Sequence, residues 1–252
     1  KQAYLLDLGE ESDRSKAYEL LKNADVVISN YRTKVAEKLG VDYPTLSAMN
    51  PQLIFAQLNA FDENSERPAF DVVLQAEAGF MYMNGEADGP PVKMPVALID
   101  ILAAHQLKEG ILLALLRRMQ TGQGAYVVTS LFDAAVASLV NQATNWLMGG
   151  HIPQRMGTQH PNIAPYGDIY HCRNGKPILL AVGTEKQFRN LCNVLKVDSI
   201  DTRFSTNILR VKNRAALNDW LVTAFKPIMR ESELNRLAGT TYLLTGVAIV
   251  AW

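Results

Sequence analysis

Short apolar runs alternate with stretches of helical spacing along the first third of the chain. Residues 3–8 (AYLLDL) and 25–29 (DVVIS) are rich in large aliphatic or β-branched side chains, a composition typical of buried strands. Between them, residues 13–24 carry apolar side chains at the spacing of a helix. This order predicts a β-α-β unit.

The alternation continues as far as residue 61. Residues 33–40 predict a helix that ends in glycine, and residues 43–50 predict a short helix that ends before Pro51. Residues 52–61 form a third apolar run. We therefore expect an α/β fold with a mostly parallel sheet, helices on its faces and ligands beyond the carboxyl ends of the strands.

The middle of the chain predicts two helices separated by a loop. Residues 70–83 keep helical register, and the Gly- and Pro-containing residues 84–95 interrupt it. Residues 101–120 are apolar on most of a helical circumference. We expect this second helix to be buried between layers.

The second half of the chain predicts a change of domain. Residues 125–150 indicate a strand that leads into a long helix and ends at two glycines. We expect a large domain over residues 1–150, a linker over 151–165, a small α+β domain over 166–240 and a strand over 241–252 that returns toward the large domain. Within the small domain we expect a hairpin that turns at Asn174-Gly175, a helix over 185–195 and helices over 211–238.

The charge balance, apolar runs and cysteines of the chain limit the kinds of binding partner to be expected. Lys plus Arg and Asp plus Glu both number 25, so the formal charge is zero and gives no general attraction to nucleic acid or an anionic membrane. No apolar run approaches the length of about 20 residues that spans a bilayer, and the first residues lack the layout of a signal peptide. The two cysteines lie at no metal or redox spacing. We expect a cytoplasmic protein that binds neither nucleic acid nor a membrane.

The usual motifs for metal, serine and nucleotide chemistry do not occur. No two histidines stand at a metal-binding spacing, and we expect no metal. There is no Gly-x-Ser-x-Gly elbow and no glycine-rich fingerprint after a strand. His105 is interpreted as a core histidine.

Asp100 is the strongest candidate for chemistry. It is the only charged residue of the apolar run 95–104 and stands where a helix begins. Aspartate is a preferred helix cap, which is the simpler interpretation. A carboxylate buried among apolar residues costs several kcal/mol, however, and such a cost is typical of functional sites. Capping and catalysis are compatible, and we expect Asp100 to be buried and to cap its helix.

A second candidate site follows the strand over 25–29. Asn30 stands at the carboxyl end of that strand, and Arg32, Lys34 and Lys38 lie on the following turn and helix, where they could hold phosphates. The alternative is an ordinary solvated helix face, which the spacing alone favours.

Four separated stretches of the chain can be compared together. They are NADVVISNYRTKVAEKLGVDYPTLSAMNPQLIFAQLNAF, RPAFDVVLQAEAGFMYMNGEADGPP, ALIDILAAHQLKEGILLALLRRMQTGQGAYVVTSLFDA and RMGTQHPNIAPYGDIYHCRNGKPILLAVGTEKQF. Together, in this order and over nearly the whole chain, they resemble the family III CoA-transferases, which include formyl-CoA:oxalate and carnitine CoA-transferases and, as relatives, the α-methylacyl-CoA racemases.

The resemblance implies a Rossmann-like large domain, a small α+β domain and an interlocked homodimer. It implies that the protein transfers CoA from an acyl-CoA thioester to a small carboxylic acid. In this reaction Asp100 is the nucleophile that attacks the thioester. It also implies that Leu6, Asn30 and Lys38 contact coenzyme A, with Lys38 in place of an arginine. We expect Arg32 to be a further contact because of its position on the turn after Asn30. Coenzyme A is then a substrate, and no metal is needed.

Several positions depart from the family pattern. Gly9 stands where a lysine can bind phosphate, Ala104 replaces a glycine, and the loop over 156–167 lacks a glycine string. Phe70 occupies the place of a tyrosine in some transferases and of the catalytic histidine in the racemases, while Glu185 falls near the racemase glutamate. A racemase and an inactive fragment or paralogue are therefore the alternatives to a transferase.

Overall fold

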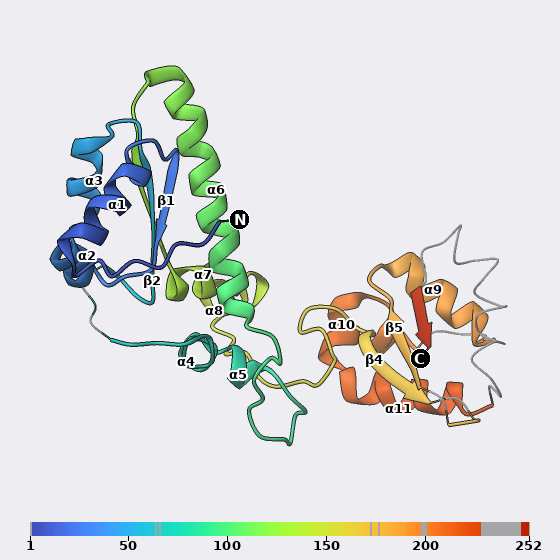
Figure 1. Ribbon diagram of the computed structural model, residues 1–252. Coiled ribbons are helices and arrows are strands. Elements are labelled where there is room, and N and C mark those ends of the chain that lie inside the picture. Colours follow the sequence, from blue (N-terminus) through green and yellow to red (C-terminus); the bar gives the residue numbers. More distant parts are fainter. Residues whose placement is uncertain are drawn as a thin grey trace. The chain divides into compact units, whose positions relative to one another are not determined.

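The computed structural model describes residues 2–63, 65, 67–171, 173–175, 177–197, 201–227 and 248–251. The chain divides into two compact units, residues 1–84 with 91–154 and residues 85–90 with 155–252 (Figure 1). The sequence placed a single boundary after residue 150. The segment 85–90, which belongs to the second unit, was not anticipated.

A parallel sheet forms the centre of the first unit. Its strands are β1 (Val26–Ser29), β2 (Ile54–Asn59) and β3 (Ala125–Ser130), in the order β1-β2-β3. The middle strand β2 is buried on both faces, and Ile54, Phe55 and Ala56 are each at most 1% exposed. The predicted α/β class and parallel pairing are confirmed.

Helices cover both faces of this sheet (Figure 1). One face carries α1 (Glu11–Leu21), α2 (Thr33–Leu39) and α3 (Tyr43–Met49), packed around a shared apolar core. The other face carries α6 (Leu98–Thr121), which contacts β2 and β3. At both Gly40 and Gly122 a left-handed glycine ends the helix, as the sequence predicted for residues 33–40.

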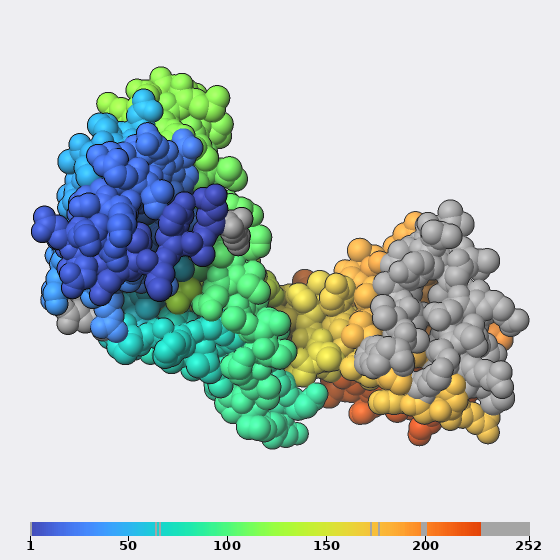
Figure 2. Space-filling view, viewed as in Figure 1, coloured from blue at the N-terminus to red at the C-terminus, as the bar shows by residue number. Residues whose placement is uncertain are grey.

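The strand expected over residues 3–8 is wrong. These residues form no strand, Leu5 is fully exposed, and the segment lies at the surface of the first unit (Figure 2). A strand needs a neighbour for its backbone hydrogen bonds, and among the described residues the sheet ends at β1 and β3.

Two expected long helices are broken. The stretch 70–83 divides into α4 (Asp71–Glu77) and α5 (Phe80–Met83), because Gly79 has a φ of 83°. The helix expected after β3 divides into α7 (Leu131–Ala137) and α8 (Asn141–Gly149), and Val140 has a φ of 41° at the break. The helical period continues through both breaks, which is why the sequence did not reveal them.

Helix α6 is not buried around its circumference. Only a stripe of it is buried, comprising Ile99, Ala103, Leu107 and Ala114. The opposite face exposes apolar side chains within this chain, namely Ile101, Leu112, Leu113, Leu116 and Met119. His105 is exposed rather than part of the core, and its Nδ1 lies 2.9 Å from Lys108 Nζ. None of the described helices is long and apolar enough to cross a membrane.

The second unit packs helices on an antiparallel sheet. Its strands are β4 (Tyr166–His171), β5 (Pro177–Ala181) and β6 (Ala248–Ala251). Its helices are α9 (Glu185–Val194), the 3-10 turn Thr202–Phe204, α10 (Asn207–Lys212) and α11 (Arg214–Phe225).

Most of the expected elements of this unit are present. Strands β4 and β5 form the predicted hairpin, and Gly175 turns it with a φ of 81°. Thr184 and Gln187 form a capping box at the start of α9. Strand β6, which lies within the strand expected to return toward the large domain, pairs with β5 and belongs to the sheet of the second unit. The part of the helices expected over 211–238 that follows residue 227 lies outside the described residues.

Candidate active site

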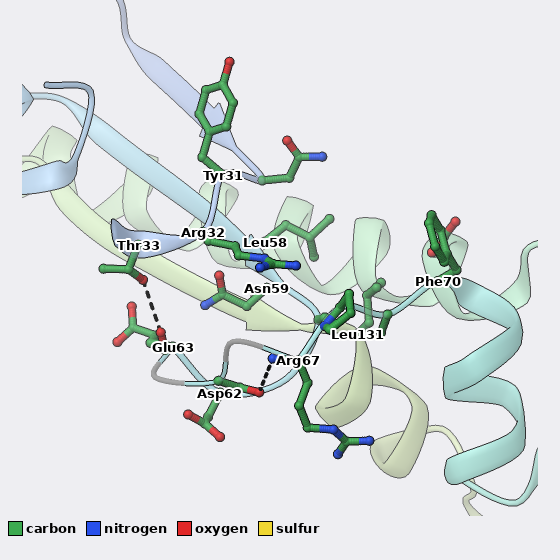
Figure 3. A pocket seen from close by; sticks show the side chains of 16 residues that line it. Tyr31, Arg32, Thr33, Leu58, Asn59, Asp62, Glu63, Arg67, Phe70 and Leu131 are labelled. Atoms are coloured by element: carbon green, nitrogen blue, oxygen red, sulfur yellow. Dashed lines mark hydrogen bonds between the residues drawn. The ribbon is translucent and has the colours of Figure 1, made fainter. Parts of the chain in front are cut away.

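A cavity of 540 Å³ lies at the carboxyl ends of the parallel strands (Figure 3). It is bordered by the loop after β1, the end of β2 with the loop that follows it, and the starts of α6 and α7. The residues that line it are Asn30, Tyr31, Arg32, Thr33, Leu58, Asn59, Ala60, Asp62, Glu63, Ser65, Arg67, Pro68, Ala69, Phe70, Asp100 and Leu131. This is the position expected for a ligand of a parallel α/β sheet.

The loop after β1 is held by a buried glutamine. Gln57 is 3% exposed, and its Nε2 donates to Tyr31 O at 2.8 Å and to Asn59 Oδ1 at 2.9 Å. Ser29 Oγ accepts from the amide of Tyr31 at 3.2 Å. These bonds fix the backbone that carries Arg32, whose side chain extends along Leu58 into the pocket (Figure 3).

The loop after β2 is also tied down. Thr33 Oγ1 donates to Glu63 O at 3.2 Å, and the hydroxyl of Tyr126 donates to the Glu63 carboxylate. Burial and the neighbouring Glu63 together raise the pKa of Tyr126, so its hydroxyl keeps the proton it donates. Arg67 pairs with Glu77, and its guanidinium carbon lies 4.2 Å from the centre of the Phe61 ring. This wall of the cavity is therefore held by several charged contacts.

A second hollow continues from the first. Its volume is 560 Å³, and it shares Arg32, Thr33, Glu63 and Ser65 with the cavity described above. The remaining lining comes from α2, through Lys34, Val35 and Glu37. The two hollows together provide room for an elongated ligand with a charged end near α2.

Asp100 lines the cavity, but two expectations about it are wrong. Its side chain is exposed in this chain rather than buried, because the apolar neighbours in sequence point around the helix and do not cover it. It is also the third residue of α6 and makes no capping bond; the helix begins after Ala97.

The cap comes from another segment. Asp71 Oδ1 accepts from the amide of Ile99, in the first turn of α6, at 2.7 Å. Although Asp100 is exposed, nearby protein atoms remove part of its hydration, which raises its pKa above the ordinary value, and the charge of Asp71 raises it further. Asp71 and Asp100 therefore have different surroundings, and of these two carboxylates Asp100 lines the cavity and Asp71 does not.

Three of the predicted site residues come together, and two do not. Asn30, Arg32 and Asp100 line one cavity, whereas Lys38 and Leu6 lie outside it. Lys38 is exposed in the last turn of α2, and Leu6 is half-buried in the N-terminal segment.

Sequence reasoning missed Asp71 and Gln57. The signal for Asp71 was an acidic residue in the first turn of α4, directly after Phe70. A polar residue inside the apolar run of β2 was the signal for Gln57.

Glu185 is occupied by a structural ion pair. Its Oε2 lies 2.7 Å from Nη1 of Arg210, which is 1% exposed, and its Oε1 accepts from the amide of Asn207 at 2.7 Å. Burial acts to raise the pKa of Glu185, but the bonds from Arg210 and Asn207 outweigh it and lower the pKa. Both carboxylate oxygens are thus engaged within the second unit.

The described residues contain no cluster of side chains that could bind a metal ion. Among the residues described in both units, no three His, Cys, Asp or Glu side chains gather closely enough to hold a metal ion. Cys192 is buried, and burial raises the pKa of its thiol to about 11.

Comparison with known proteins agrees with a parallel α/β protein that has a cavity at the carboxyl ends of its strands. The sequence model of CoA-transferase family III matches residues 1–249 of the chain. The chain belongs to this family.

Named relatives and solved structures cover most of the chain. Succinate–glutarate CoA-transferase of Agrobacterium fabrum is 35% identical over 88% of the chain and 56% of its own length. Acetyl-CoA:oxalate CoA-transferase of Acetobacter aceti is 34% identical over 86% of the chain and 57% of its own length. The crystal structure of a CaiB/BaiF family protein from Brucella suis is 37% identical, with a TM-score of 0.75 over 97% of the chain and 64% of that structure. The chain thus spans just over half the length of these two curated relatives.

Proposed function

We propose that the protein is a CoA-transferase that moves CoA from an acyl-CoA thioester to a small carboxylic acid, with Asp100 as the nucleophile. The observation that carries the proposal is the position of the Asp100 carboxylate in the 540 Å³ cavity at the carboxyl ends of the sheet. The transferase activities named for its relatives support it.

The proposed reaction consists of four acyl transfers. A carboxylate oxygen of Asp100 attacks the donor thioester, which gives a mixed anhydride and CoA thiolate. The thiolate attacks the aspartyl carbonyl, which gives an aspartyl-CoA thioester and releases the donor acid. The acceptor carboxylate attacks this thioester to form a second anhydride and thiolate. The thiolate then attacks the acceptor acyl carbon, which yields the new acyl-CoA and restores Asp100.

Each step needs donors for a tetrahedral oxyanion. The first turn of a helix presents backbone amides that are not used within the helix. Asp100 lies in the first turn of α6, so nearby amides are available to a carbonyl oxygen bound beside it. A metal is not required for any of the four transfers.

Coenzyme A is proposed to lie along the two connected hollows. Asn30 and Arg32 are proposed to bind its polar parts, and the proposal is supported by their position in the lining of the cavity that holds Asp100. Lys38 is proposed to contribute charge from the end of α2, and Leu6 to contact the adenine, although both lie outside the cavity lining.

The racemase alternative is less well supported. A racemase needs a second proton carrier beside the aspartate. Phe70 stands in the cavity wall where the racemases have histidine, and its ring cannot accept a proton. Both oxygens of Glu185 are bonded to Arg210 and Asn207.

A cytoplasmic homodimer is proposed as the working form. The exposed apolar side chains of α6, such as Leu113 and Met119, support a partner surface on this helix. The low cysteine content of the chain favours a reducing compartment.

The experiment is a panel of acyl-CoA donors with short mono- and dicarboxylic acids, in which new acyl-CoA products are identified by mass spectrometry. The native protein is expected to form at least one acceptor acyl-CoA, and Asp100→Asn to form none. Glu109→Gln is the matched control, because it neutralises an exposed acid on the same helix outside the cavity. Wash-in of solvent deuterium at the α-carbon without acyl exchange would instead favour the racemase, and neither activity would favour the inactive alternative.

A further inference from the structure

Asp71 and Gln75 form a hydrogen-bonded pair beneath the start of α6. Asp71 Oδ2 accepts from Gln75 Nε2 at 2.6 Å, and Gln75 is fully buried. The same amide group donates to Val96 O at 3.3 Å, and Gln75 Oε1 accepts from the amide of Met94 at 2.8 Å. With the bond from Ile99 to Asp71, the pair fixes three points on the segment that delivers Asp100.

Asp71 and Gln75 act together because they lie on the same face of α4. Asp71 and Gln75 are four residues apart in α4, so their side chains lie on one face of that helix. Burial of a glutamine without partners would cost free energy, and here both ends of its amide are bonded. Residues 94–97 form neither helix nor strand before α6 begins, so the side chains of Asp71 and Gln75 anchor this segment.

We infer that Asp71, held by Gln75, is a positioning residue for Asp100: it fixes the first turn of α6 and places a negative charge beside the carboxylate that becomes acylated. This inference rests on the proposed function of Asp100. Asp71 itself lies outside the cavity lining and does not act on the substrate.

The charge of Asp71 favours acylation. Free Asp100 is an anion and is repelled by Asp71. An anhydride or a thioester at Asp100 is neutral, so the repulsion is relieved when it forms. The same repulsion makes the Asp100 carboxylate more basic, and a more basic carboxylate is the stronger nucleophile.

Other charged groups line the same cavity as Asp100, namely Arg32, Asp62, Glu63 and Arg67. The neighbouring segments also carry ionisable side chains: Lys93 in the loop before α6, His105, Lys108 and Glu109 farther along α6, and Asp133, which bonds Ser130, on α7. After partial desolvation, the charge of Asp71 is the second cause that raises the pKa of Asp100.

The test uses the full chain and three substitutions. Asp71→Asn keeps an acceptor for Ile99 but removes the charge. Asp71→Asn with Gln75→Glu restores a donor-acceptor pair and moves the charge one turn along α4. Asp71→Ala removes both functions. Glu109→Gln on α6 is the control for a general change of charge.

Two measurements on the ligand-free protein do not depend on activity. Carbon-13 NMR of the Asp100 carboxyl, assigned with Asp100→Asn, is expected to titrate at lower pH in Asp71→Asn and in the double variant than in the native protein. Hydrogen exchange at Ile99 is expected to quicken about tenfold in Asp71→Ala and to stay near native in Asp71→Asn. An unchanged Asp100 titration in Asp71→Asn, or native exchange in Asp71→Ala, would overturn the inference.

The rate of Asp100 acylation by acyl-CoA links the inference to function. Asp71→Asn is expected to lower it about tenfold at saturating acyl-CoA, and Asp71→Ala about 100-fold. The double variant is expected to regain neither a native acylation rate nor native thermal stability, because a glutamate at the buried position 75 cannot donate to Val96 O. Recovery of both would reduce Asp71 to a structural role. Altered titration in a protein that never acylates would contradict the proposed function alone, whereas acylation with unaltered titration would contradict this inference alone.

Discussion

Glu185 and Arg210 form an ion pair in which Oε2 of the acid lies 2.7 Å from Nη1 of a guanidinium that is 1% exposed. Arg210 also donates to Ala164 O and Phe204 O and lies over the ring of Phe188. A buried charge with this many partners is a structural centre of the second unit. The role of Glu185 is therefore to compensate Arg210 rather than to move protons.

Glu185→Gln is expected to lower the free energy of unfolding by about 1–3 kcal/mol, because it removes the charged partner of a buried cation. Lys186→Ala, on the same helix and exposed, is the control and is expected to change stability little. The depressed pKa of Glu185 means that its contribution is present above its ordinary value of 4.5 and is lost as the pH falls below that value toward the folded-state pKa. Chemical denaturation at several pH values measures this, and equal acid sensitivity of native and variant protein would contradict the assignment.

Arg32→Ala is expected to weaken CoA binding by about 10- to 100-fold, because Arg32 lines the cavity and a bond to an anion is worth about 1.5–3 kcal/mol. Lys38→Ala is expected to change affinity only about twofold, since an exposed charge outside the cavity acts through solvent. Isothermal titration with CoA compares them, and Arg32→Lys shows how much depends on charge alone. A larger effect at Lys38 than at Arg32 would place the bound phosphates elsewhere.

Gly124→Ala is expected to destabilise the first unit by about 1–3 kcal/mol, because a Cβ at this position would lie 2.1 Å from Leu53 O. Gly124 also donates its amide to Pro51 O at 2.8 Å, so the backbone cannot easily move away. Thermal unfolding tests this against Gly149→Ala, where a Cβ would meet nothing within 4 Å. Equal melting temperatures for the two variants would contradict the close approach of strands β2 and β3 at this end.

Asp100→Asn is expected to raise the thermal stability of the protein near neutral pH. A carboxyl group whose pKa is raised by folding costs stability when it is ionised, so the loss is present above the folded-state pKa and disappears as the pH falls below its ordinary value of 3.8. The difference in melting temperature between variant and native protein should shrink on acidification. A variant that is less stable than the native protein at pH 7 would show that Asp100 has a structural role.

Local patterns predicted much of the fold. The apolar runs over 25–29 and 52–61 form the strands β1 and β2, and Gly40 ends its helix as a left-handed residue. The strand expected over 3–8 failed because strand formation depends on a neighbour, which a local pattern does not contain.

The sequence identified three residues of the candidate site but not the contacts around them. Asp100, Asn30 and Arg32 were all selected from the sequence, and they line one cavity. The acceptor for the first turn of α6 is Asp71, which is 28 residues earlier than Ile99 in the chain. Such a contact depends on how α4 packs beside α6, and no spacing rule within a single helix contains that information.

The most direct test of the central claim is to identify the residue that becomes acylated during turnover. The full chain is mixed with acyl-CoA and quenched with hydroxylamine, and peptide mass spectrometry locates the hydroxamate. The proposed function predicts a hydroxamate on Asp100 that requires acyl-CoA and is lost in Asp100→Asn but not in Glu109→Gln. Acyl exchange that proceeds without any adduct at Asp100, or with the adduct on another residue, would contradict it.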